Sequence, residues 1–201
     1  MSTRDYKLFR PGGYYHLYNR GDNREALFHD EWDYVQFLKR FKLALGLAVD
    51  PKLKIRAFPD DSFTLLAYCL MDNHFHLLIK QETELPVGEL VRKVGTSYAK
   101  YFNARYKRVG NIFQDVFKAK DVGNDEYITY LTAYIHLNPL EPFEYQYSSL
   151  PEYLGRRNGT LCDPGFVLGL FGGDRERYRK FLENYSYRDH QKIEHLGFDE
   201  D

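Results

Sequence analysis

The chain has 201 residues, enough for one domain of ordinary size with an appendage, and 43% of them are hydrophobic and 28% charged. This composition excludes a disordered chain, and a formal net charge of −1 excludes a uniformly basic nucleic-acid binder. No apolar run reaches the roughly 20 residues of a membrane span. The start of the chain lacks the apolar stretch of a secretory signal, and the two cysteines fit a reducing compartment, so we expect a cytoplasmic protein without membrane contacts.

The first half of the chain predicts strands and one helix. Its patterns indicate, in chain order, a strand at 13–19, a helix at 31–47, an extended piece at 53–58, and strands at 62–71 and 74–80. Asp30 is a good N-cap for the helix. Only Asp72 and Asn73 separate the last two apolar runs, which predicts a buried β-hairpin.

The second half predicts a further helix, strand and helix before a different kind of segment. Apolar spacing indicates a helix at 87–106, a strand at 111–119, a helix at 124–137 and a last helix near 174–185. The first seven elements have the order β-α-ββ-α-β-α, whose first six match a ferredoxin-like split βαβ layout. We therefore expect an α+β fold with an antiparallel sheet and helices on one face. Residues 1–140 would form this domain, and 141–201 would be a partly helical C-terminal extension.

His74 and His76 lie two residues apart on a predicted strand. Side chains alternate between the two faces of a strand, so both imidazoles project from one face and Phe75 from the other. Two converging imidazoles can hold a divalent metal, but a pair of hydrogen-bonded surface histidines has the same pattern. The pair alone leaves both readings open.

The helix at 124–137 carries a stripe of tyrosines. At about 100° per residue, Tyr127, Tyr130, Tyr134 and Asn138 fall on one narrow face. A stripe that only packs on the sheet explains Tyr127 and Tyr130 well. Docked beside the histidine pair, however, such a helix would bring an amide oxygen as a third ligand and a phenol as a nucleophile. A tyrosine that attacks a phosphodiester needs this combination of a metal and an aligned nucleophile.

Three blocks of sequence resemble one known family. Residues 68–79 (YCLMDNHFHLLI) look like the His-hydrophobic-His signature of the single-tyrosine HUH transposases. Residues 97–103 with 110–114, and residues 134–139 (YIHLNP), resemble that family's second helix with its next strand and its tyrosine helix. The similarity runs over roughly 12–140 and is strongest to the REP-associated tyrosine transposases, which act on single-stranded palindromic repeats.

This resemblance implies a set of roles. Tyr134 would be the catalytic nucleophile, and His74, His76 and Asn138 would hold Mg²⁺ or Mn²⁺. The reaction would nick and rejoin single-stranded DNA beside hairpin-forming repeats through a 5′-phosphotyrosine, which supports DNA transposition. The family includes enzymes that work as monomers and as homodimers, so the oligomeric state stays open.

A basic segment suggests where DNA would bind. Residues 91–120 carry eight basic residues and one acid, a net charge of +7 interleaved with aromatic residues, as in single-strand binders. The candidate DNA-binding residues there are Arg92, Lys93, Lys100, Arg105, Lys107, Arg108, Lys118 and Lys120. Arg20 and Arg24, in the turn after the first strand, are further candidates.

Other functions share parts of this pattern. A domesticated DNA-binding protein would keep the fold without cleavage. A rolling-circle replication initiator or relaxase would share the histidine pair, although many place it and the tyrosine in another order. A metal-dependent hydrolase would use water in place of the tyrosine, but the sequence offers no extra carboxylate cluster for it.

Overall fold

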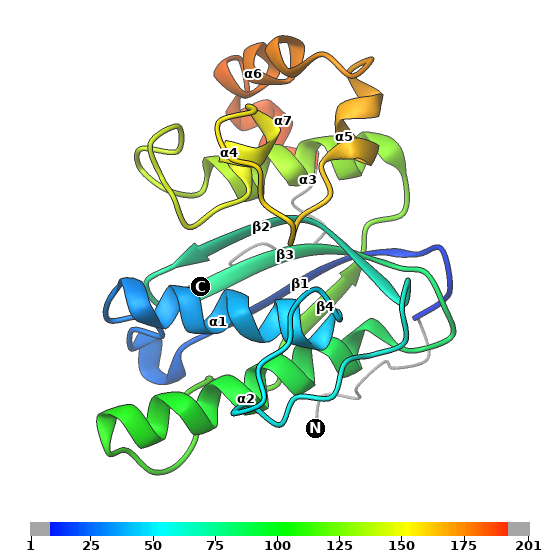
Figure 1. Ribbon diagram of the computed structural model, residues 1–201. Coiled ribbons are helices and arrows are strands. Elements are labelled where there is room, and N and C mark those ends of the chain that lie inside the picture. The colour runs from blue at the N-terminus through cyan, green and yellow to red at the C-terminus, as the bar shows by residue number, and fades with distance from the viewer. Residues whose placement is uncertain (1–8, 193–201) are drawn as a thin grey trace.

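The computed structural model describes residues 9–192, and its centre is a four-stranded antiparallel sheet (Figure 1). The strands are β1 (Tyr14–Arg20), β2 (Phe63–Met71), β3 (His74–Gln81) and β4 (Lys118–Asp121), in the spatial order β2-β3-β1-β4. The β2-β3 pair is the predicted hairpin, with Asp72 and Asn73 as its turn. The predicted α+β class and antiparallel sheet are confirmed.

Helices cover both faces of the sheet, which corrects the expectation of helices on one face. Helices α1 (Glu31–Ala44) and α2 (Val87–Tyr106) pack together on one side, whereas α3 (Asp125–Leu137) lies across the other (Figure 1). The β3 residues explain the arrangement, because Phe75 points to α1 and both neighbouring histidines point to α3. A sheet that is buried on both faces needs such a second layer.

Side-chain caps fix where α1 and α3 begin. The Asp30 carboxylate accepts a hydrogen bond from the backbone N–H of Asp33 at 3.2 Å. Asn124 caps α3 in the same way, accepting from the Tyr127 N–H at 3.0 Å. A short 3₁₀ turn, η2 (Asp22–Arg24), follows β1 and connects it toward α1.

The segment after α3 completes the fold. It contains α4 (Leu150–Tyr153), α5 (Gly165–Leu170), α6 (Arg175–Glu183) and α7 (Tyr187–Gln191), which gather over α3 in Figure 1. Helix α6 corresponds to the predicted helix near 174–185. Before α4, the backbone runs along the outer edge of β2, where the Leu70 N–H donates to the Tyr147 carbonyl at 3.0 Å. This contact covers a sheet edge that would otherwise expose unpaired backbone groups.

Two predicted extended pieces are wrong. Of the strand expected at 111–119, only residues 118 and 119 are in a strand, at the start of β4. The residues before them follow an irregular path, with one isolated bridge between Gly21 and Phe113. Two backbone bonds connect this stretch to the end of β1, from the Asp22 N–H to the Ile112 carbonyl and from the Gln114 N–H to the Arg20 carbonyl, each at 3.0 Å. Beyond them the Asn19 amide donates to the Asp115 carbonyl at 3.0 Å. The piece at 53–58 forms no strand either. It ends against the end of α1, where the Phe58 N–H donates to the Ala44 carbonyl at 2.8 Å.

None of the helices within residues 9–192 is both long and apolar enough to cross a membrane.

Candidate active site

The site lies between β3 and α3, on the face of the sheet that carries His74 and His76. Their rings lie 5.1 Å apart between centroids and nearly perpendicular, at 86°. His76 is fully buried, and His74 is partly exposed. Strand alternation therefore brings the two imidazoles together as the sequence predicted.

Helix α3 places Tyr134 on this pair. The Tyr134 ring lies 5.3 Å from the His76 ring, edge-on at 86°. Tyr130 points elsewhere: it packs against Phe181 at 5.7 Å, and the Lys192 ammonium lies 4.0 Å from its ring centroid. The structure thus separates Tyr130 from Tyr134, which contacts the histidine pair.

Asn138, directly after α3, faces His74. Its Oδ1 lies 3.2 Å from His74 Nε2, and on the other side of the ring Nδ1 lies 2.7 Å from Asn73 Oδ1. The Asn73 amide has a fixed direction, because its Nδ2 donates to the Arg24 carbonyl at 3.2 Å. In the neutral tautomer with its N–H on Nδ1, that hydrogen is donated to the Asn73 oxygen and the Nε2 lone pair faces Asn138.

The sequence prediction missed His16 and Tyr18, which share this face. His16 is fully buried on β1, and its Nε2 lies 3.0 Å from His76 Nδ1 with the rings stacked at 5.2 Å. Tyr18 stacks on His16 at 4.7 Å. Burial, reinforced by the nearby His76, holds the pKa of His16 well below its usual range, so the ring is neutral. Alternation along 13–19 would have placed both side chains on one face, but it could not show which face.

Four of the predicted DNA-binding residues lie near the histidine pair. Arg20 on β1 lies directly opposite His74 on β3. On the other side of β1, Lys118 lies opposite Tyr18 and Lys120 opposite His16. Residues opposite each other on neighbouring strands project from the same face, so these basic side chains share the site's face. The Lys118 ammonium lies 5.6 Å from the centroid of the Tyr18 ring. Arg24 is in η2, where its carbonyl accepts from Asn73.

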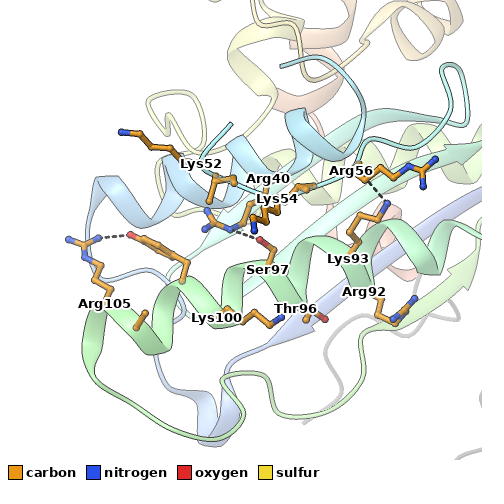
Figure 2. A pocket seen from close by; sticks show the side chains of 14 residues that line it. Arg40, Lys52, Lys54, Arg56, Arg92, Lys93, Thr96, Ser97, Lys100 and Arg105 are labelled. Atoms are coloured by element: carbon orange, nitrogen blue, oxygen red, sulfur yellow. Dashed lines mark hydrogen bonds between the residues drawn. The ribbon is translucent and has the colours of Figure 1, made fainter. Parts of the chain in front are cut away.

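The other predicted DNA-binding residues lie on or after α2, on the opposite side of the sheet. Three are in ion pairs: Arg92 with Glu89, Arg105 with Asp33 at 2.8 Å, and Arg108 with Glu25 at 2.9 Å. Lys107 ends α2 in the left-handed conformation. Arg92, Lys93, Lys100 and Arg105 instead line an open pocket of about 1030 Å³ between α1, α2 and residues 52–56 (Figure 2). The structure therefore does not bring the α2 part of the basic segment to the histidine pair.

The donor set of the site fits a divalent cation. No group of three or more His, Cys, Asp or Glu side chains that could hold a metal occurs within residues 9–192, so the two imidazoles need a different third ligand. Asn138 Oδ1, which lies 3.2 Å from His74 Nε2, is placed to meet that need. Nitrogen with amide oxygen is a donor set that suits Mn²⁺ better than Mg²⁺.

Comparison with known proteins finds one family model and a solved structure that match this chain. The family model described as "Transposase IS200 like" matches residues 11–138, which is more than half of the chain. A solved structure of a REP-associated tyrosine transposase bound to a REP hairpin matches with a TM-score of 0.58 and 15% sequence identity, over 81% of this chain and 94% of that one. At this identity the likeness concerns the fold. The comparison with curated proteins finds no match.

Proposed function

The chain belongs to the IS200-like transposase family, and on that premise we propose that it nicks and rejoins single-stranded DNA through Tyr134. The observation that carries the proposal is the contact of the Tyr134 ring with His76, beside a His74 that faces Asn138. The substrate class would be hairpin-forming repeats, by analogy with the DNA in the structural relative. The outcome would be the mobilisation of such repeats.

In the proposed step, the phenol oxygen of Tyr134 attacks the scissile phosphorus. An O–P bond forms to tyrosine and the bond from phosphorus to the 3′ oxygen breaks. The phenol loses its proton, and the departing 3′ oxygen gains one. The number of phosphodiester bonds is unchanged, so a free 3′ hydroxyl can reverse the reaction without ATP. The histidines are ligands in this scheme, not proton acceptors.

His74, His76 and Asn138 would hold the divalent ion, Mn²⁺ or Mg²⁺. When bound, that ion supplies positive charge that neutralises the phosphate and polarises its bond. Asn73 and His16 would orient the two imidazoles through their Nδ1 atoms, so that Nε2 of each ring faces the ion. With Nε2 of His76 as the ligand, Nδ1 carries the proton and donates to His16.

Basic side chains on the same face would hold the strand that is cut. Arg20, Lys118 and Lys120 flank the histidines across β1 and β4 and are suited to neighbouring phosphates. Tyr134 contacts His76 of its own chain, so the proposal is that one copy acts in cis and that no exchange of α3 between copies is needed.

A covalent-adduct assay tests the proposal. Labelled single-stranded oligonucleotides carrying a hairpin with flanking bases are incubated with the protein and Mn²⁺ or Mg²⁺, then analysed on a denaturing gel. We expect an adduct that is absent with Tyr134→Phe and in chelator. Tyr130→Phe is the matched control, because Tyr130 packs on α6 and should keep full activity.

The outcomes separate the competing functions. An adduct that persists in Tyr134→Phe would refute the assigned nucleophile. Binding of hairpin DNA without any adduct would identify a DNA-binding protein that has lost cleavage. Metal-dependent cutting without an adduct would identify a hydrolase.

A further inference from the structure

A smaller cavity lies where the C-terminal extension meets the sheet domain. Helix α1 and β2 supply one wall, and α4 with the loop at 157–161 supplies the other. Its volume is about 370 Å³, within the range of small-molecule sites, which runs from roughly 300 to 1,000 Å³. None of the residues assigned above to the metal, to Tyr134 chemistry or to DNA lines it. The proposed function therefore leaves this cavity without a role.

Much of the cavity wall is apolar. Val35 and Leu38 of α1 and Leu161 of the loop all line it. Val35 is 41% exposed, although the opposite face of α1 packs in the core. An apolar body lying against these side chains would remove their surface from water, which favours binding.

The charges around the cavity favour an anion. Its lining residues include three cations, Lys39, Lys42 and Arg157, and one acid, Glu152. Glu152 is 5% exposed and already neutralised, because Nε and Nη2 of Arg157 donate to its two oxygens at 2.8 and 2.6 Å. Lys39 pairs with Asp50 at 2.5 Å, whereas Lys42 pairs with no acid in residues 9–192. The charge that is left over is positive.

Tyr68 adds a buried hydrogen-bond donor to the lining. Its side chain is 2% exposed, and its hydroxyl accepts from Arg157 Nη2 at 3.0 Å. Within residues 9–192, no group accepts the hydrogen of this hydroxyl. Burial, together with nearby Glu152, raises the pKa of Tyr68, so the hydroxyl keeps that hydrogen. A buried donor without an acceptor is destabilising, and a ligand oxygen would satisfy it.

From these features we propose that the cavity binds a small carboxylic acid with an apolar body. The carboxylate would accept from the Tyr68 hydroxyl and lie among the cations, and the body would cover Val35, Leu38 and Leu161. The ligand would touch both walls, so it would hold the extension against α1 and β2. This inference does not rest on the proposed function, because neither DNA nor a metal takes part in it.

Calorimetric titration of the full chain, without DNA or metal, tests the inference. The acidic probes are decanoate and phenylacetate, and decanol and phenylethanol are their uncharged counterparts. Thr160→Trp places a large ring at the cavity, since Thr160 is an exposed lining residue. Asn158→Trp is the matched control, because Asn158 is exposed in the same loop and does not line the cavity.

We expect at least one acid to bind with a stoichiometry of one, and its uncharged counterpart to bind about tenfold more weakly. Thr160→Trp should abolish this binding, and Asn158→Trp should retain it. Lys42→Gln should weaken the acid by about threefold, relative to Lys180→Gln on the exposed face of α6. Tyr68→Phe should weaken it by about tenfold. Saturating acid should also raise the unfolding temperature of the parent chain but not that of Thr160→Trp.

Four results would overturn the inference. If neither acid binds at millimolar concentration, the cavity is not a site for this class of ligand. Equal affinity for an acid and its uncharged counterpart would remove the role of the carboxylate. Binding that survives Thr160→Trp, or that is lost equally in Asn158→Trp, would mean that the ligand lies elsewhere. The covalent-adduct assay is unaffected by each of these results, so the two proposals fail separately.

Discussion

At the scale of single residues, Asn73 is placed to select which nitrogen of His74 carries the proton. Its Oδ1 lies 2.7 Å from Nδ1, and a proton held there leaves the lone pair on Nε2, which faces Asn138. Removing such an orienting partner typically lowers metal affinity by roughly ten- to a hundredfold. We therefore expect Asn73→Ala to weaken Mn²⁺ binding by roughly this factor, measured by the loss of the free-ion electron paramagnetic resonance signal.

The control for this experiment is Asn158→Ala, an exposed asparagine in the loop after α4. It should bind Mn²⁺ as the parent does. Nitrogen chemical shifts of His74 in the metal-free protein provide a second measurement, since Asn73→Ala should mix the two neutral tautomers. Unchanged Mn²⁺ affinity and unchanged shifts would show that Asn73 does not orient the ring.

His16 has the same role toward His76, but from inside the core. When His76 binds through Nε2, its Nδ1–H needs an acceptor, which is His16 Nε2 at 3.0 Å. His16→Gln retains an acceptor, so we expect it to keep much of the Mn²⁺ affinity, whereas His16→Leu should lose about tenfold or more. Thermal unfolding of both variants shows whether each is folded. Equal affinity in the two variants would mean that the buried contact only fills space.

At the scale of elements, His136 fastens α3 to the C-terminal segment. Its Nδ1 lies 2.7 Å from the Tyr178 hydroxyl of α6, and its Nε2 lies 2.7 Å from Ser149 Oγ, next to the edge of β2. Burial lowers the pKa of His136 to about 3, so the folded protein holds the ring neutral. The hydrogen bonds of His136 thereby attach the helix that carries Tyr134 to the C-terminal segment, and this attachment depends on pH.

The direction of this dependence follows from proton binding. Between about pH 6.5, the ordinary pKa of histidine, and pH 3, the unfolded chain binds a proton at His136 that the folded protein excludes. Stability is therefore full above pH 6.5 and falls toward lower pH, by about 1.4 kcal/mol per pH unit inside the window. Urea unfolding at several pH values should show this slope. His136→Gln should be less stable at pH 7 but have a flatter profile, with the remaining slope from His16. A profile as steep as the parent's would refute the assignment.

The sequence was most informative where regular periodicity governs the structure. Alternation placed His74 and His76 on one face of β3, and helical spacing placed Tyr134 and Asn138 together at the end of α3. Periodicity says nothing about which face of the sheet a helix covers, so it could not place α2 away from the histidines or predict helices on both faces. It also failed at 111–117, where the chain makes only one isolated bridge to Gly21 and then the contact of the Asn19 amide with the Asp115 carbonyl.

At the scale of the whole molecule, charge is divided between two faces. The +7 of residues 91–120 seemed to belong to one DNA-binding surface, but α2 and β4 put its members on opposite sides of the sheet. Lys118 and Lys120 remain with the histidines, whereas Lys93 and Lys100 line the open pocket between α1 and α2. A net charge near zero therefore coexists with two separate basic surfaces.

The extension after residue 140 shares its core with the sheet, so we expect residues 1–140 alone not to fold cooperatively. Tyr153 donates to the Leu66 carbonyl at 2.9 Å, and the Asp163 N–H donates to the Leu65 carbonyl at 2.9 Å, so β2 depends on the extension for its edge bonds. Tyr153 and Tyr178 are also fully buried in the same hydrophobic cluster as the strands. Removing them would expose apolar surface and leave buried carbonyls without donors.

Calorimetry and hydrogen exchange on residues 1–140 and on the full chain measure this dependence. The full chain should unfold in one cooperative transition, and the truncated chain should lose protection across β2 and β3 first. Because α3 would lose its contact with Tyr178, the truncated chain should also fail to form the DNA adduct. A truncated chain that melts cooperatively within a few degrees of the full chain would instead establish a separate domain ending near residue 140.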